Sequence, residues 1–227
     1  YVAPKSRFDK NSRESVSYYH LVLLAENMEG YQNLIKLVSF GYTEGFYYKP
    51  RVDEELLRKY HKGIIATSAC LAGPVAKMLI NGSYDIAKDM ALKYLDIFGE
   101  GNFYLELQDH GIPEQKTVNA GLIKMSRETG IPLICTNDVH YIKHDDWEAH
   151  DILLCIQTGK TVNDENRMRY AGNCYHLKSY EEMSQLFSYI PEAMENTNKI
   201  AERCNLHFMN LNFLNMMFPT DIQLMSI

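Results

Sequence analysis

The sequence predicts an α/β fold, with a largely parallel sheet or barrel and helices on its outside. Short, mostly apolar, β-prone runs alternate with stretches in which apolar residues recur at helical spacing. The β-prone runs show little polar alternation, which is typical of strands buried on both faces. Strands give way to helices near residue 160, so we expect a mostly helical carboxyl-terminal part.

The first half of the chain contains two strand and helix units. Residues 18–24 (YYHLVLL) are apolar apart from His20 and predict a strand, and residues 30–39 then predict a helix. A second, short amphipathic helix follows Pro50. Residues 63–67 (GIIAT) predict another buried strand, which ends in a turn of small residues up to Gly73.

Two further units complete the predicted sheet. Ser83 is a candidate cap for a helix closed by Gly99, and residues 102–107 (NFYLEL) predict a strand. A helix begins at Pro113 and ends near Gly130. Residues 131–136 (IPLICT) form the clearest predicted strand.

Helices dominate the rest of the sequence. Residues 145–158 predict a helix that offers four large side chains for packing: Trp147, Ile152, Leu153 and Ile156. Ser179 and Glu182 have the spacing of a capping box, and Pro191 starts a last helix that ends near Cys204. The segment after Phe208 has neither helical nor strand periodicity.

Composition excludes several classes of protein. Of 227 residues, 46% are hydrophobic and 23% charged, which argues against a disordered chain, and the formal net charge of −6 argues against non-specific nucleic-acid binding by this segment alone. Five widely spaced cysteines fit a reducing cytoplasm rather than a disulfide framework. No run is long and apolar enough for a membrane span, and the residues from Tyr1 onward lack the basic and then apolar pattern of a signal peptide. The chain starts at Tyr1 without an initiator methionine, so we expect a piece of a longer protein.

Asp138 and His140 form the sharpest candidate site. They directly follow the strand predicted over residues 131–136, and functional groups collect at the carboxyl ends of strands in such folds. In an extended segment, residues two apart point to the same side, so both side chains could reach one zinc, manganese or iron ion. The alternative is a polar turn that leaves the strand.

Cys70 and His20 are weaker candidates. Cys70 lies a few residues after the strand over 63–67, where a thiolate could ligate a metal, although free cysteine is more often a small buried side chain. His20 lies within an apolar strand, where a hydrogen-bonded core histidine is the usual explanation.

Asp109 and His110 follow the third predicted strand and are candidates for substrate contact or the rim of the site. In the alternative, Asp109 accepts bonds from local backbone groups and Gly111 adopts a positive φ. Phosphate-loop, dinucleotide, nucleophile-elbow and zinc-protease motifs are absent, which argues against those common classes.

Several long runs occur in an order that resembles a known family, the amino-terminal PHP (polymerase and histidinol phosphatase) domains of bacterial replicative DNA polymerase III alpha subunits. The similarity covers about residues 1–208 and rests on these runs: YVAPKSRF, YYHLVLLAENMEGYQNLIKLVS, GFYYKPRVD, ATSACLAGPVA, YLELQDHGIPEQ, ICTNDVHYI, AHDILLCIQTGK and PEAMENTNKIAERC. The resemblance implies a distorted, incomplete β/α barrel over residues 1–160 that lacks its first strands. Residues 161–208 would be a helical continuation and the start of a linker, and 209–227 an atypical tail.

The resemblance also implies a metal site. Four residues match the family's ligand positions: His20, Cys70, Asp138 and His140. The other five of nine ligand positions would lie before Tyr1. In the complete PHP site, zinc or manganese would generate a hydroxide and clamp a phosphoester.

The implied function is that of a fragment of a DNA-directed DNA polymerase, inactive by itself, whose PHP domain supports the core and contributes 3'-5' exonuclease chemistry in metal-binding members. The implied partners are DNA primer-template, dNTPs and other replicase subunits, with magnesium at a palm domain far downstream. Two alternatives remain: a free-standing metal-dependent PHP phosphoesterase, and a non-catalytic docking platform for a proofreading exonuclease.

Overall fold

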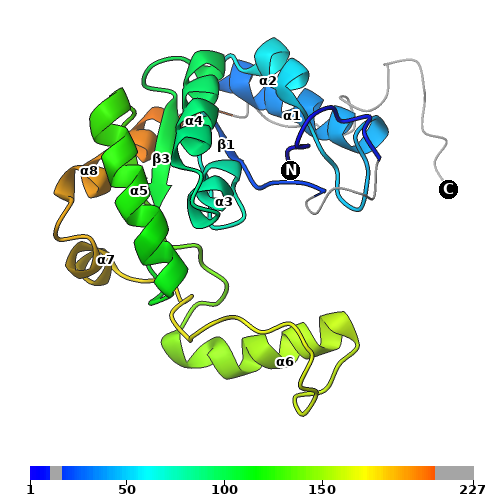
Figure 1. Cartoon of the computed structure of the whole chain (residues 1–227), viewed down its shortest axis with the longest axis vertical. Helices are drawn as coiled ribbons and strands as arrows, with labels where there is room; N and C mark the ends of the chain where they lie inside the picture. The colour runs from blue at the N-terminus through cyan, green and yellow to red at the C-terminus, as the bar shows by residue number, and fades with distance from the viewer. Residues whose placement is uncertain (11–16, 208–227) are drawn as a thin grey trace, which may run out of the picture.

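The computed structural model describes residues 1–10 and 17–207, which form an α/β fold around a four-stranded sheet (Figure 1). The strands follow one another across the sheet in chain order: β1 (Val22–Ala25), β2 (Ile64–Thr67), β3 (Phe103–Leu107) and β4 (Leu133–Cys135). β2, β3 and β4 are parallel, whereas β1 is antiparallel to β2. Within the described residues the sheet does not close, as expected for an incomplete barrel.

Helices connect the strands and cover the outer face of the sheet. The first five are α1 (Met28–Thr43), α2 (Glu54–Tyr60), α3 (Pro74–Ile80), α4 (Tyr84–Phe98) and α5 (Pro113–Thr129). The short 3₁₀ helix η1 (His144–Asp146), α6 (Trp147–Thr158), α7 (Tyr180–Leu186) and α8 (Pro191–Arg203) follow β4. Among the described residues, no helix combines the length and the apolarity needed to cross a bilayer.

The two faces of the sheet differ because strand residues alternate between them. On β3, the odd-numbered residues Phe103, Leu105 and Leu107 belong to the main core that lies against the outer helices. Tyr104, between them, lies in a second, small cluster on the inner face with Ile65, Ile134 and Ile200. The inner face is therefore only partly filled by apolar side chains.

The last helix, α8, lies along β4, and its side chains form hydrogen bonds with backbone groups on the edge of β4 that has no neighbouring strand among those described. The Thr197 hydroxyl donates to the Cys135 carbonyl over 2.8 Å and accepts from the Cys135 N–H, and the Asn196 amide donates to the Leu133 carbonyl. At its end, Arg203 binds the Glu26 carboxylate over 2.8 Å. These contacts satisfy edge groups that would otherwise lack partners.

Arg51 holds the segments around the first helix together. Its side chain is fully buried and donates to four backbone carbonyls, those of Gly45, Ser17, Arg7 and Asp9. These carbonyls come from three separate stretches of chain. One guanidinium therefore donates the hydrogen bonds that, in regular helices and sheets, backbone N–H groups would donate.

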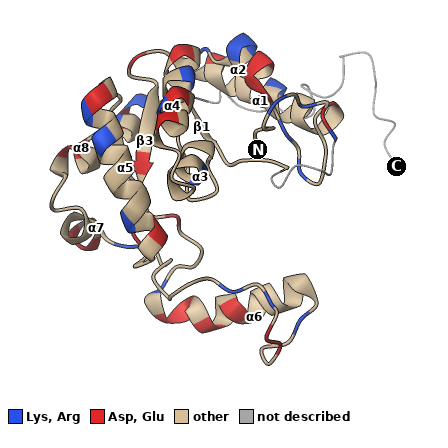
Figure 2. Ribbon diagram, in the orientation of Figure 1, with Lys and Arg blue, Asp and Glu red and all other residues tan. Residues whose placement is uncertain are grey.

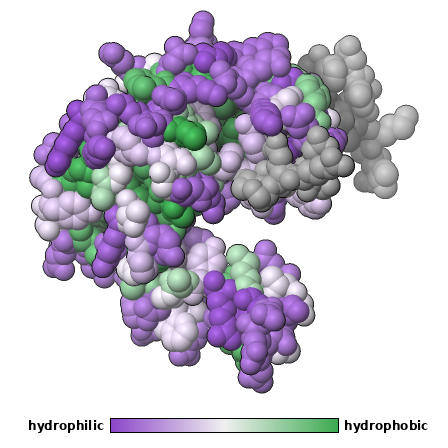
Figure 3. All heavy atoms as spheres, in the orientation of Figure 1, coloured by the Kyte–Doolittle hydropathy of each residue, from purple (hydrophilic) through white to green (hydrophobic). Residues whose placement is uncertain are grey.

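α6 and the loop after it form an arm that projects from the body (Figure 1). In the space-filling view this arm stands apart from the body, whose visible face is mostly hydrophilic with apolar atoms between the helices (Figure 3). The packing expected for this helix is not observed. Leu154 and Cys155 are buried, whereas Ile152, Leu153 and Ile156 are 52%, 60% and 71% exposed.

Other sequence expectations differ from the structure in detail. The first strand begins at Val22 rather than residue 18, because Tyr19 pairs with Val2 in an isolated bridge and the His20 N–H donates to the Ala72 carbonyl. Ser83 precedes α4, but its side chain makes no capping hydrogen bond. The Ser179 capping box is confirmed. Helix α3, which the sequence did not predict, begins at Pro74 directly after the turn of small residues. The predicted tail after residue 208 lies outside the described residues.

Candidate functional site

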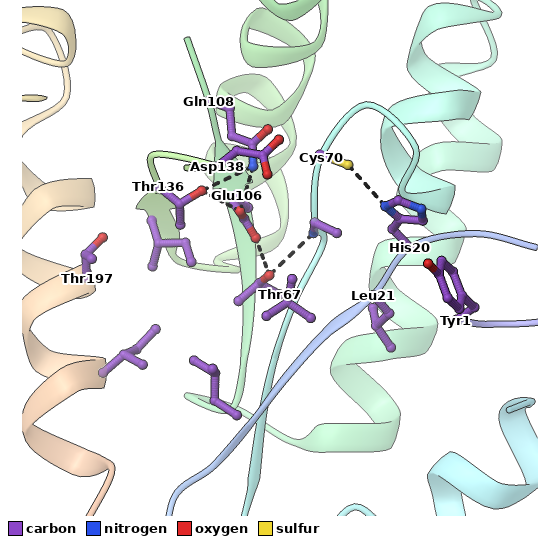
Figure 4. A pocket seen from close by; sticks show the side chains of 15 residues that line it. Tyr1, His20, Leu21, Thr67, Cys70, Glu106, Gln108, Thr136, Asp138 and Thr197 are labelled. Carbon is purple, nitrogen blue, oxygen red and sulfur yellow. Dashed lines mark hydrogen bonds between the residues drawn. The ribbon is translucent and has the colours of Figure 1, made fainter. Parts of the chain in front are cut away.

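A cavity of about 570 Å³ opens on the inner face of the sheet, at the carboxyl ends of β2, β3 and β4 (Figure 4). Three inner-face rows follow the period of two along these strands. The apolar row of Ile65, Tyr104 and Ile134 lies below a polar row of Thr67, Glu106 and Thr136. Beyond it the rim carries Gln108, Asp138 and Cys70. The polarity of the sheet face thus changes from apolar to polar toward the strand ends.

His20 and Cys70 meet at one side of this cavity. Since β1 is antiparallel to β2, the amino end of β1 lies beside the carboxyl end of β2, and Val22 pairs with Thr67. His20 Nδ1 lies 3.5 Å from Cys70 Sγ, and the His20 N–H donates to the Ala72 carbonyl. Two residues that the sequence separates by fifty positions therefore become neighbours.

Burial sets the protonation of this pair. Burial lowers the pKa of His20 and raises the pKa of the Cys70 thiol. A neutral imidazole and a protonated thiol are the expected states near neutral pH. A neutral imidazole can act directly as a metal ligand, whereas the thiol would have to release its proton on binding.

Glu106 is the central residue of the cavity that the sequence reading missed. Its buried carboxylate accepts hydrogen bonds from Thr67 on β2, from Thr136 directly after β4 over 2.5 Å, and from the Gln108 amide over 2.9 Å. These donors satisfy a charge that would otherwise be costly to bury. The sequence does contain an indication of this role, because Glu106 lies within the apolar run NFYLEL and a buried strand rarely carries an unpaired charge.

Two backbone positions at the cavity rim have unusual conformations. Ala69 and Asp138 adopt φ of +60° and +46°, in the left-handed region that residues with a Cβ rarely occupy. Both follow the carboxyl end of a parallel strand. Such conformations cluster at functional sites, so they favour this rim as the functional part of the fold.

The backbone at Asp138 separates it from His140. An extended segment would have placed both side chains on one side, but the positive φ of Asp138 breaks the extended geometry. Asp138 lines the cavity, whereas His140 is exposed on the side of the arm. There His140 Nε2 lies 2.8 Å from the Tyr170 hydroxyl, and its Nδ1 lies 2.8 Å from the Asp138 carbonyl oxygen.

Asp109 and His110 lie outside the lining of this cavity. Asp109 accepts from the Gly111 N–H over 2.9 Å, and Gly111 has a φ of +76°, which matches the turn expected as the alternative. His110 is buried, stacks on Tyr175 with ring centroids 4.1 Å apart, and bonds Gln115 and the Asn137 carbonyl. His110 thus joins the β3–α5 turn to the loop after β4.

The candidate ligands do not form a metal site on their own. His20, Cys70 and Asp138 share the cavity, but in the described part of the chain no three histidine, cysteine, aspartate or glutamate side chains are grouped closely enough to hold a metal ion. A structural or catalytic zinc ion is usually held by three or four protein ligands in close geometry. The described residues therefore supply part of a possible site and not a complete one.

Comparison with known proteins finds similarity to one domain family and to one kind of protein. Residues 1–110 match the model of the PHP domain. The chain is 48% identical over 207 residues to the DNA polymerase III subunit alpha of Treponema pallidum (strain Nichols), which covers 91% of this chain and 18% of that protein. It is 47% identical over 206 residues to the subunit of the same name from Borreliella burgdorferi, covering 90% of this chain and 18% of that protein.

A more distant match has the same extent. The DNA polymerase III subunit alpha of Thermus aquaticus is 40% identical over 214 residues, which cover 91% of this chain and 17% of that protein. The chain thus spans less than a fifth of the length of the curated relatives that it matches.

Proposed function

We propose that residues 1–110, which match the PHP domain model, form such a domain and that the chain works as part of a replicative DNA-directed DNA polymerase. The observation that carries this proposal is identity of 40 to 48% along about nine tenths of the chain to relatives of that name. The parent protein would bind DNA primer-template and dNTPs and transfer nucleotides with magnesium at a separate palm domain. This segment would support the polymerase core, in the cytoplasm, with other replicase subunits.

The cavity at the strand ends would be the functional centre of the segment. His20, Cys70 and Asp138 line it, and the Glu106 network fixes the strand ends from which two of them project. We propose that these three residues, with His140 after a rotation away from Tyr170, contribute to a zinc or manganese site that further ligands complete. Such a site would support phosphoester cleavage, and in the parent protein 3'-5' exonuclease activity.

A docking platform for a separate proofreading exonuclease is the second candidate. It is favoured by the observation that His140 binds Tyr170 and that the described residues alone do not group three metal ligands. In that case the segment would act through its surface and without a metal.

Two parts of the chain have different proposed roles. Residues 1–160 would form the barrel portion, whose strands carry the cavity. Residues 161–208 would be a helical continuation that leads toward the polymerase core, and α8, which covers the edge of β4, would anchor it. The role of residues 209–227 stays a prediction from sequence, as an atypical tail.

Primer extension by the complete product of the gene that contains this sequence tests the polymerase proposal. We expect template-directed addition of dNTPs to a primed single-stranded template in the presence of magnesium. Omission of the dNTP that the template calls for next is the control and should stop extension. A purified, folded full-length product that adds no nucleotide to the primer would contradict the proposal.

A further inference from the structure

A second, smaller cavity lies in the arm, away from the site described above. It has a volume of about 160 Å³ and is enclosed between α6 and the loop that runs back along that helix. Trp147, His150 and Asp151 contribute from α6, and Arg167 and Arg169 contribute from the loop. Figure 2 shows basic residues in this loop beside the acidic residues of α6.

The two arginines have different partners. Arg167 forms a two-pronged pair with Asp151, with Nη1 and Nη2 each 2.6 Å from a carboxylate oxygen, and this hydrogen bonding lowers the pKa of Asp151. The charges of that pair cancel. Arg169 donates to the Val162 carbonyl over 3.3 Å but pairs with no carboxylate among the residues that the structure describes. The lining of the cavity therefore keeps one uncompensated positive charge.

Arg167 also has an unused donor. Its side chain is 4% exposed, and its Nε is buried without an acceptor within residues 1–10 and 17–207. Buried donors in folded proteins nearly always have an acceptor, so this one calls for an explanation. Both Nη atoms of Arg167 are taken up by Asp151 and its Nε has almost no accessible surface, so Arg169 is the donor left for a ligand in the cavity.

The remaining lining favours a phosphorylated ligand. A guanidinium matches the oxygens of a phosphate in geometry and charge. The Tyr170 and His150 rings line the same cavity, and Trp147 offers a flat apolar surface of the kind on which nucleobases stack. A volume of about 160 Å³ accommodates a phosphate group but not a large organic ligand.

We propose that this cavity binds the phosphate group of a nucleotide or of a nucleic-acid strand, with Arg169 as the donor and Trp147 beside it. This site is separate from the cavity at the strand ends and does not depend on a metal there. It gives an acidic chain a local point of attachment for a polyanion, even though the net charge of −6 opposes non-specific binding.

Trp147 is the single tryptophan of the chain and therefore reports on the cavity directly. The experiment titrates the 227-residue chain at constant ionic strength with inorganic phosphate, a deoxynucleoside monophosphate and a single-stranded oligodeoxynucleotide. Tryptophan fluorescence is the first readout and isothermal calorimetry the second. We expect saturable binding, and the ligand that binds at the lowest concentration identifies the source of the phosphate.

Arg169→Gln and Lys160→Gln are the matched variants. Both remove one positive charge from the same loop, but Lys160 does not line the cavity. Loss of one guanidinium–phosphate contact should weaken binding roughly ten-fold or more in Arg169→Gln and leave Lys160→Gln close to the unmodified chain. Absence of saturable binding of all three ligands in both readouts would overturn the proposal, and so would equal weakening by the two variants.

Discussion

The carboxylate of Glu106 on β3 accepts a hydrogen bond over 2.5 Å from the hydroxyl of Thr136, which directly follows β4. Its other oxygen accepts from Thr67 on β2, so one side chain joins three parallel strands at the level of the candidate site. Asp138 follows Thr136 by two residues, and Cys70 follows Thr67 by three residues. The Glu106 network therefore determines where the cavity rim lies.

Glu106→Gln should destabilise the fold by about 1–3 kcal/mol. The side-chain amide of the variant has one acceptor oxygen and one N–H₂ donor group, whereas the carboxylate has two acceptor oxygens. The donor group would face the hydroxyl and amide donors that now bind the carboxylate, and some of these buried groups would lose their acceptor. Denaturant unfolding followed by far-UV circular dichroism measures the change. Glu100→Gln, at an exposed position, is the control, and equal stability of the two variants would contradict the structural role of Glu106.

Arg51→Met should destabilise the fold by about 3 kcal/mol or more. The substitution keeps an apolar stem but leaves four carbonyls without their donor, each in or near the protein interior. The melting temperature of the variant, compared with that of Arg127→Met on the exposed face of α5, measures the effect. A shift no larger than that of the control would show that water replaces the guanidinium.

His110 should make stability depend on pH. Burial lowers its pKa, so below about pH 6.5 the unfolded chain binds a proton that the folded chain excludes. Stability due to this residue is complete above that pH and falls as the pH decreases toward the lower folded-state pKa. One histidine contributes at most about 1.4 kcal/mol per pH unit.

Replacement of His110 checks this directly. The free energy of unfolding of His110→Gln, measured at several pH values between about 5 and 8, should vary less steeply with pH than that of the unmodified chain. His207→Gln, at an exposed position, should keep the original slope. An unchanged slope in His110→Gln would mean that this ring titrates alike in both states.

Most helices and strands could be predicted from the sequence, because the spacing of apolar residues and the glycines and prolines at the ends of helices indicated the same elements. Gly99 and Gly130 end α4 and α5 as expected, and Pro113 and Pro191 begin α5 and α8. The direction of β1 could not be predicted, since an apolar strand reads the same whether its neighbour is parallel or antiparallel. That direction is what brings His20 to Cys70.

The candidate site was predictable in part for the same physical reasons. Three of the four expected ligand residues line one cavity because strand ends meet at one edge of the sheet. His140 does not line the cavity, because the left-handed backbone conformation of Asp138 breaks the extended segment. This conformation could not be predicted from the sequence, since position 138 is not a glycine. The exposure of the apolar side chains of α6 could not be predicted either, because an apolar helix face in a sequence does not show whether another element packs against it.

Metal content of the complete gene product tests the role of the strand-end cavity most directly. Elemental analysis after extensive dialysis should find stoichiometric zinc or manganese in the unmodified protein. Asp138→Asn should lose most of that metal, whereas Asp109→Asn, which alters a carboxylate outside the cavity, should retain it. Absence of bound metal in the unmodified protein, or equal metal content in the two variants, would contradict a metal-binding role for this cavity.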